Sequence, residues 1–139
     1  MFFADVRGIN GRNPLHGAAH SGNFEMVRTL IEYDRAYIKA RDSGGSTPLL
    51  SGLGGRNFKD SSVLRLLPEN GADINVSNQI GRTPLIKASF HGALETVRLL
   101  LEHGADVDVK NINGKTALQF ATDRGHGEVV ELLREHGAK

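Results

Sequence analysis

Cysteine is absent from this sequence of 139 residues. Without a thiol, the chain has no disulfide framework, no thiolate metal site and no thiol nucleophile. Because many small extracellular domains depend on disulfides, this absence favours an intracellular protein, either cytoplasmic or nuclear.

Long apolar runs and an excess of one charge are also missing. The first ten residues contain two phenylalanines but lack the apolar core of a signal peptide, and no segment approaches the roughly 20 apolar residues that a membrane-spanning helix needs. Seventeen Lys and Arg residues against sixteen Asp and Glu residues give a formal net charge of +1. This balance offers no overall attraction to nucleic acid or to an acidic membrane, so we expect neither as a partner.

What the sequence does contain is an internal repeat. One glycine marker recurs at Gly11, Gly45, Gly81 and Gly114, with offsets of 34, 36 and 33 residues. A second marker, a Gly-Ala pair, recurs every 33 residues from Gly71 onward. Two markers in phase predict four copies of one structural unit within a single domain. That domain covers residues 1–139, and the copies span approximately residues 10–39, 44–76, 80–109 and 113–139.

Each copy begins with signals for a helix. Thr47, Thr83 and Thr116, with Asn13 in the first copy, are residue types whose side chains cap helix N-termini. Proline, which suits the first helical position, follows three of the four. A second helix comes after a short turn, and it is clearest from Leu94 to His103, where the apolar residues fall on one stripe. The polar segment after that helix is too short for another one, so it predicts an extended, hairpin-like connection.

Two segments carry the repeat most clearly. Residues 10–19 read N-G-R-N-P-L-H-G-A-A, and residues 95–107 read E-T-V-R-L-L-L-E-H-G-A-D-V. This pattern resembles the ankyrin repeat, and the resemblance covers nearly the whole chain. It implies an all-α fold, an ankyrin-repeat solenoid of stacked helix-turn-helix units joined by β-hairpin-like loops. The alternative, an ordinary helical bundle with fortuitous spacing, does not explain why two markers recur in phase.

The second copy departs from the pattern. It has Leu-Ser-Gly-Leu at residues 50–53, where the family has His-x-Ala-Ala, and its extra residues fall within residues 54–62, where we expect an irregular loop. The glycines from Gly44 to Gly55 are expected to weaken its first helix, by about 1 kcal/mol for each interior glycine relative to alanine. Pro68 is expected to distort the last turn of its second helix. Repeat two is therefore predicted to be the weakest unit of the array.

Residues that could carry chemistry are scattered. There are six histidines, but none clusters with other ligands in the way that a metal site requires. His16 occupies the Thr-Pro-Leu-His position of the family, where the resemblance implies a structural hydrogen bond to nearby backbone. No glycine-rich stretch has the spacing of a phosphate loop, and Ser51, Ser61 and Ser62 lack an identifiable base. We therefore expect no catalytic residue, no metal and no cofactor, that is, a protein that is not an enzyme.

The resemblance also implies a binding surface. In the ankyrin family the hairpin tips and first helices line a concave face, and residues between the fixed motif positions select the partner. Arg12, Arg82 and Lys115 occupy equivalent positions, so stacking is expected to align them in a positive row that Ser46 interrupts. Apolar residues beside this row suit a partner that bears acidic groups around an apolar anchor. The candidate partner-binding residues, carried over by position, are Ile9, Asn10, Arg12, His20, Ser46, Ser51, Gln79, Ile80, Arg82, Lys87, Phe90, Ile112, Asn113, Lys115, Phe120 and Asp123.

Two functions fit this pattern. The first is a monomeric protein–protein interaction module of the adaptor, scaffold or inhibitor type. The second is a targeting or regulatory segment of a larger enzyme, channel or effector protein. In both cases the partner is another protein, and the framework residues do not identify it because they serve the stacking of repeats.

Overall fold

The computed structural model describes residues 9–53 and 61–139 of the chain. This part contains eight α-helices and no strand, so the all-α fold expected from the sequence is confirmed for it. Two short 3-10 helices, Ile9–Gly11 and Arg35–Ile38, lie before the first α-helix and after the second. The α-helices are α1 (Pro14–Ser21), α2 (Phe24–Tyr33), α3 (Pro48–Leu53), α4 (Ser61–Glu69), α5 (Pro84–His91), α6 (Leu94–Glu102), α7 (Ala117–Asp123) and α8 (Gly127–Glu135).

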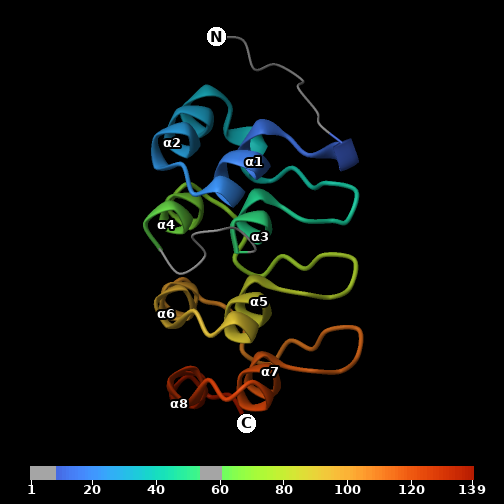
Figure 1. The fold of residues 1–139 in the computed structure, drawn as a ribbon, viewed down its shortest axis with the longest axis vertical. Coiled ribbons are helices and arrows are strands. Elements are labelled where there is room, and N and C mark those ends of the chain that lie inside the picture. The colour runs from blue at the N-terminus through green and yellow to red at the C-terminus, as the bar shows by residue number, and fades with distance from the viewer. Residues whose placement is uncertain (1–8, 54–60) are drawn as a thin grey trace.

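The helices stand in two columns (Figure 1). The first helices of the repeats, α1, α3, α5 and α7, form one column in which each contacts the next, and the second helices, α2, α4, α6 and α8, form the other. The loops before α3, α5 and α7 project from the first column, on the side away from the second column. This arrangement is the expected solenoid of helix-turn-helix units joined by hairpin-like loops.

Three of the four predicted N-caps are present. The side chain of Asn13 accepts a hydrogen bond from the backbone N–H of His16 at 3.0 Å. Thr83 and Thr116 accept the equivalent bonds from the residue three positions on, at 3.2 and 3.3 Å. Thr47 is the exception, because its hydroxyl oxygen is buried and has no hydrogen-bond partner in the described part of the chain. The prediction that the Thr47 side chain caps α3 is therefore wrong.

Neighbouring hairpins are joined by backbone hydrogen bonds. The N–H of Ser43 donates to the carbonyl of Asn10 at 2.7 Å, and the two later pairs of hairpins are joined by equivalent bonds of 3.0 and 3.1 Å. The approach is tightest at Gly81, where φ is +75° and an added Cβ would lie 3.0 Å from the Cα atom of Asn111. Glycine is needed there both for the left-handed conformation and for the neighbouring backbone. The hairpins therefore stack in a fixed register.

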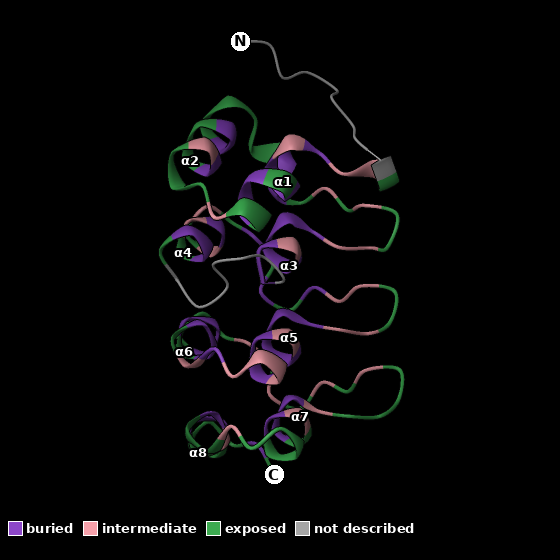
Figure 2. Ribbon diagram, viewed as in Figure 1, coloured by how far each residue is buried: buried purple, intermediate pink, exposed green. Residues whose placement is uncertain are grey.

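The apolar core runs along the stack between the two columns (Figure 2). The leucine that follows each helix start is almost completely buried: Leu15, Leu49, Leu85 and Leu118 are 0%, 1%, 1% and 6% exposed. Because the first helices pack on one another from repeat to repeat, each leucine is covered partly by a neighbouring unit. A single repeat cannot bury its apolar face alone, so the core exists only in the stack.

His16 links the first two repeats. Its ring is fully buried, and its Nδ1 atom accepts a hydrogen bond from the N–H of Asn13 at 3.1 Å. Its Nε2 atom donates to the carbonyl of Ser46, in the next repeat, at 2.8 Å. The structural role that the family resemblance implied for His16 is confirmed.

The predictions for repeat two concern the segment before α4 and the end of that helix. Ser61 and Ser62, the last two residues of the range in which a loop was expected, are helical, and residues 54–60 lie outside the described part of the chain. Pro68 lies inside α4, and the helix still continues to Glu69, the position at which α6 also ends. Its last turn differs as expected, because the N–H of Asn70 donates only to a carbonyl three residues back, whereas the equivalent N–H of His103 also reaches the carbonyl four residues back. A proline this close to a helix end removes a single intrahelical N–H donor, which the packing of α4 tolerates.

Gly52 in α3 serves close packing. An added Cβ would lie 2.6 Å from the Cδ2 atom of Leu64 and 3.4 Å from the Cβ atom of Ala19. It is the one glycine of the Gly44 to Gly55 set that is helical in the described residues. The expectation that these glycines only weaken the first helix is therefore incomplete, because Gly52 lets α4 and α1 approach α3.

We predict opposite effects of alanine at two helical glycines. Gly52→Ala should lower the free energy of unfolding by about 1 kcal/mol or more, because overpacking against Leu64 outweighs the gain in helix propensity. Gly17→Ala should raise it by about 0.5–1 kcal/mol, since Gly17 is exposed in α1 and nothing lies within 4 Å of an added Cβ. Urea unfolding of both variants measures the difference. A stabilised Gly52→Ala variant would contradict the close packing of α3.

Candidate partner-binding surface

The hairpins and the first helices share one face of the solenoid. Arg82, in the hairpin before α5, places its guanidinium carbon 6.0 Å from the ring centroid of Phe90 in that helix. Lys115, in the hairpin before α7, places its Nζ atom 5.5 Å from the ring centroid of Phe120. Both distances are in the range of cation–π attraction. We call the surface formed by the hairpins and the first helices the hairpin face.

Several of the predicted binding residues make contacts between repeats. The side-chain amide of Gln79 donates to a carbonyl of the preceding hairpin at 2.7 Å, and the His20 ring lies 3.3 Å from the carbonyl of Ser51 in the next repeat. The backbone carbonyls of Asn10 and Ser46 accept inter-repeat hydrogen bonds at 2.7 and 2.8 Å. These contacts show a role in stacking, while a role of the same residues in binding a partner stays a prediction.

The later hairpin tips expose apolar side chains. Ile80 is 44% exposed and Ile112 is 68% exposed, and the neighbouring Asn113 is exposed as well. The N–H of Ile112 donates to the carbonyl of Ile80 at 3.1 Å, so the two isoleucines stand on adjacent tips. The side chain of Ile9 lies outside what the structure describes. The two tips therefore offer apolar area to a partner.

Phe90 and Phe120 form the centre of the hairpin face. They come from the stacked helices α5 and α7, and their rings meet edge to face with centroids 5.8 Å apart. The guanidinium carbon of Arg124 lies 4.0 Å from the centroid of Phe90, closer than that of Arg82. Both rings are half-buried. Two arginines therefore lie over one aromatic ring, which itself contacts a second.

Sequence analysis missed Arg124. This residue follows α7 directly as its C-cap, and it stands 33 residues after His91, the last residue of α5. A residue at the end of one first helix comes close to the first helix of the preceding repeat, which is how Arg124 reaches Phe90. The signal that could have identified Arg124 is this one-repeat register. The candidate residues from the sequence came only from the hairpins and from within the first helices, and Arg124 lies just beyond α7.

The predicted positive row is uneven. Lys115 lies 3.4 Å from the Oδ2 atom of Asp123, so its charge is compensated by an exposed ion pair. Lys87, by contrast, donates from Nζ to the carbonyl of Leu50 in repeat two at 2.8 Å, and Arg12 donates to a carbonyl of α1 at 3.4 Å. Lys87 and Arg12 thus extend the positive charge toward repeats one and two.

The other cations of the hairpin face have no ionic partner. Among the residues that the structure describes, the ion pairs join Arg28 to Glu25, Arg98 to Glu95, and Lys115 to Asp123. Of the cations outside these pairs, Arg41 in the hairpin before α3 donates to the carbonyl of Ser77. Four others contact carbonyl groups or an aromatic ring of the first helices: Arg12, Arg82, Lys87 and Arg124.

Comparison with known families agrees with this architecture. A model of ankyrin repeats in three copies matches residues 53–139, and a single ankyrin repeat model matches residues 10–43. The chain belongs to the ankyrin repeat family. The resemblance inferred from the sequence motifs is therefore confirmed.

The curated relatives are much longer than this chain and differ widely in their names. Palmitoyltransferase AKR1 of Lachancea kluyveri is 45% identical over 64 residues, which are 46% of this chain and 8% of the relative. A Caenorhabditis elegans homologue of transient receptor potential cation channel subfamily A member 1 is 37% identical over 82 residues, 59% of this chain and 6% of the relative. Probable E3 ubiquitin-protein ligase XBOS33 of Oryza sativa subsp. japonica is 35% identical over 83 residues, 60% of this chain and 16% of the relative. The chain thus spans less than a fifth of the length of each.

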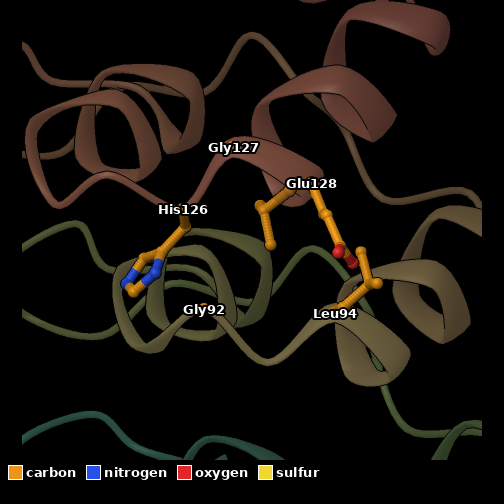
Figure 3. Close-up of a pocket in the computed structure, with 6 residues that line it drawn as sticks. Gly92, Leu94, His126, Gly127 and Glu128 are labelled. Atoms are coloured by element: carbon orange, nitrogen blue, oxygen red, sulfur yellow. The ribbon is translucent and has the colours of Figure 1, made fainter.

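One hollow lies at the turns between the helices of ankyrin repeats three and four (Figure 3). It has a volume of about 200 Å³ and lies between Gly92 and Leu94 of one repeat and Gly127 and Glu128 of the next. The Nε2 atom of His126, the one ring in the wall of the hollow, lies 3.0 Å from a carbonyl of α5, so this side chain contributes to the stacking of the two repeats.

In the described ranges no group of three His, Asp or Glu residues is arranged to hold a metal ion. No helix of the same residues is long and apolar enough to cross a bilayer.

The hairpin face holds an excess of positive charge around Lys87. Burial lowers the pKa of Lys87, and the guanidinium groups of Arg82 and Arg12 lower it further, while one carboxylate opposes them. The pKa of His91 is lowered in the same direction, first by burial and then by Lys87 and Arg124. Two neighbouring groups therefore hold their protons less tightly in the folded protein than in the unfolded chain.

We predict that the lowered pKa of Lys87 makes folding more favourable at alkaline pH. The unfolded chain keeps this proton up to its ordinary pKa of 10.5, whereas the folded protein releases it earlier. The unfolded state therefore binds more protons in the interval between the two pKa values, and the free energy of unfolding rises with pH there. Lys87→Met removes the titrating group and is the matched reference. Urea unfolding from neutral pH to about 10.5 should show the wild type gaining stability relative to this variant, and a flat or falling difference would contradict the assignment.

Proposed function

We propose that this ankyrin repeat chain is a protein–protein interaction module of the adaptor, scaffold or inhibitor type. It binds its partner through the hairpin face, with the first helices supplying charged and aromatic contacts and the hairpin tips supplying apolar ones. The observation that carries the proposal is the pair of arginines, Arg82 and Arg124, that lie over Phe90, whose ring in turn meets that of Phe120. Arginine and aromatic side chains are the residue types that concentrate binding energy at protein interfaces.

The stacking leaves this surface available for recognition. The motif leucines and His16 are buried in the core, whereas Arg124, Ile80 and Ile112 of the hairpin face are exposed. Ile80 and Ile112 stand on adjacent tips beside the cations. We assign the chain a binding role without catalysis or a cofactor, and we infer that it acts as a monomer inside the cell.

A second candidate is a targeting or regulatory segment of a larger protein. The support is that the relatives named above, a palmitoyltransferase, a cation channel homologue and a probable ubiquitin ligase, match this chain over only a small part of their length. In this case the hairpin face binds a partner on behalf of another domain. Both candidates make the same prediction for the surface, because recognition by the repeats is common to them.

We predict that removing the centre of the hairpin face abolishes partner capture. The variant combines Arg82→Ala, Phe90→Ala and Phe120→Ala, which takes away one guanidinium, the ring over which it lies and the second ring that meets the first. Loss of a few such central contacts is expected to weaken an interface by about 2 kcal/mol or more, enough to lose a partner during washing. Affinity capture from cell lysate followed by mass spectrometry compares the variant with the wild type.

The matched control lies on the second helices. It combines Arg28→Ala, Glu95→Ala and Arg98→Ala, three exposed side chains that form ion pairs on α2 and α6. Circular dichroism must show the same helical content in all three proteins at the temperature of capture, because Phe90 and Phe120 also join α5 to α7. A partner retained by the hairpin-face variant, or lost by the control alone, would refute the proposed binding surface.

A further inference from the structure

We propose that the hairpin face binds an acidic peptide segment of the partner and grips its carboxylates with cations that rest on an aromatic platform. This inference rests on the proposed function and adds the chemistry of the segment that is bound. The residues that carry it are called the cation–aromatic cluster. They are Arg12, Arg82, Lys87, Phe90, Phe120 and Arg124.

Phe90 is a platform and not a pocket for an apolar side chain. The guanidinium carbon of Arg124 lies 4.0 Å from its centroid, and that of Arg82 lies at 6.0 Å. The rings of Phe120 and His91 approach it edge to face, with centroid distances of 5.8 and 5.1 Å. The guanidinium groups therefore cover the ring from a binding partner. The apolar side chain of the partner that the sequence analysis expected fits better against the exposed isoleucines of the hairpin tips.

A stacked guanidinium remains free to bind an anion. The attraction to the ring uses the flat face of the group, whereas its N–H donors point outward in its plane. Those donors form a fork that matches the two oxygens of a carboxylate. Because the ring already restricts the arginine side chain, less conformational entropy is lost when the fork closes on a ligand. Arg124, at 4.0 Å from the Phe90 centroid, is therefore preorganised for a carboxylate, and Arg82, at 6.0 Å, lies at the outer limit of the same attraction.

The surrounding charges favour an anion at the same place. Burial and the guanidinium groups of Arg82 and Arg12 lower the pKa of Lys87, and together they outweigh the opposite effect of the Asp42 carboxylate. The pKa of His91 is lowered first by burial and then by the neighbouring cations Lys87, Arg124 and Arg82 and by His126. A bound carboxylate would reduce the repulsion between these cations. Because the cations are already gathered around Phe90, they need no rearrangement to receive it.

The cluster fits a peptide better than a nucleic acid. The whole chain has a formal net charge of only +1, and Lys115 at the border of the cluster is already paired with Asp123. Nucleic-acid binding depends on roughly 6–10 phosphate contacts along a basic stripe, whereas the adjacent tips here carry isoleucine.

Selection from a random peptide library tests the chemistry without a known partner. The full chain is compared with the double variant Arg82→Gln, Arg124→Gln, in which glutamine keeps a polar side chain and removes the charge. The matched control is Arg28→Gln, Arg98→Gln, which removes two charges from exposed ion pairs on α2 and α6. Circular dichroism establishes that all three proteins are folded before selection.

We expect the wild type and the control to select peptides enriched several-fold in Asp and Glu over the starting library. The Arg82→Gln, Arg124→Gln variant should lose this enrichment. A synthetic copy of the leading peptide should bind the variant roughly tenfold or more weakly in fluorescence anisotropy, because charge-assisted hydrogen bonds are lost. Replacing the peptide's glutamates by glutamines should weaken binding to the wild type to a similar extent.

Other outcomes separate this inference from the proposed function. Peptides that are sequence-specific but not acidic, or an acidic enrichment that persists in the Arg82→Gln, Arg124→Gln variant, would overturn the inference and leave the binding module intact. Failure to select any sequence-specific peptide would count against both. Binding about tenfold tighter to a phosphoserine version of the peptide, or to a single-stranded oligonucleotide at the same salt concentration, would overturn the assignment to carboxylates.

Discussion

The stacking of each repeat on the next is the constraint from which the rest of the structure follows. The burial of Leu15 and Leu85 depends in part on the packing of α1 on α3 and of α5 on α7. His16 and the hydrogen bonds between hairpins fix the register of neighbouring repeats. Contacts of this kind reach only the adjacent unit, so stability adds up along the array. The same register brings side chains from separate repeats onto one face, and the binding surface is a product of it.

Local rules predicted much of this fold from the sequence, and long-range packing accounts for most of the misses. The caps at Thr83 and Thr116 depend on residues three positions away, which a motif contains. Thr47 has the same motif, yet its hydroxyl makes no such bond in the described residues. From the sequence alone, Gly52 is expected only to lower the stability of its helix. The close approach of Leu64 from α4 explains why a glycine occupies this position. Local propensity cannot report contacts between segments that are distant in sequence.

The candidate surface was predictable to a similar degree. Aligning the repeats placed Arg82, Phe90 and Phe120 on one face, and the structure brings the three together. The alignment did not reveal that Lys115 is neutralised by Asp123, because that ion pair depends on side-chain reach. Stacking constrains the buried positions and leaves the exposed positions free to differ, so the framework alone does not identify a partner.

A nuclear magnetic resonance titration with an acidic peptide selected by this protein tests the central claim most directly. If stacked repeats present arginines on an aromatic platform, the Nε–Hε signals of Arg82 and Arg124 should shift together as the peptide saturates the protein, with the signals of the α2 and α6 arginines unchanged. That result would place the ligand on the hairpin face through the donors that the rings leave free. Shifts confined to α2, α4, α6 and α8, with both arginine signals unmoved, would contradict the account.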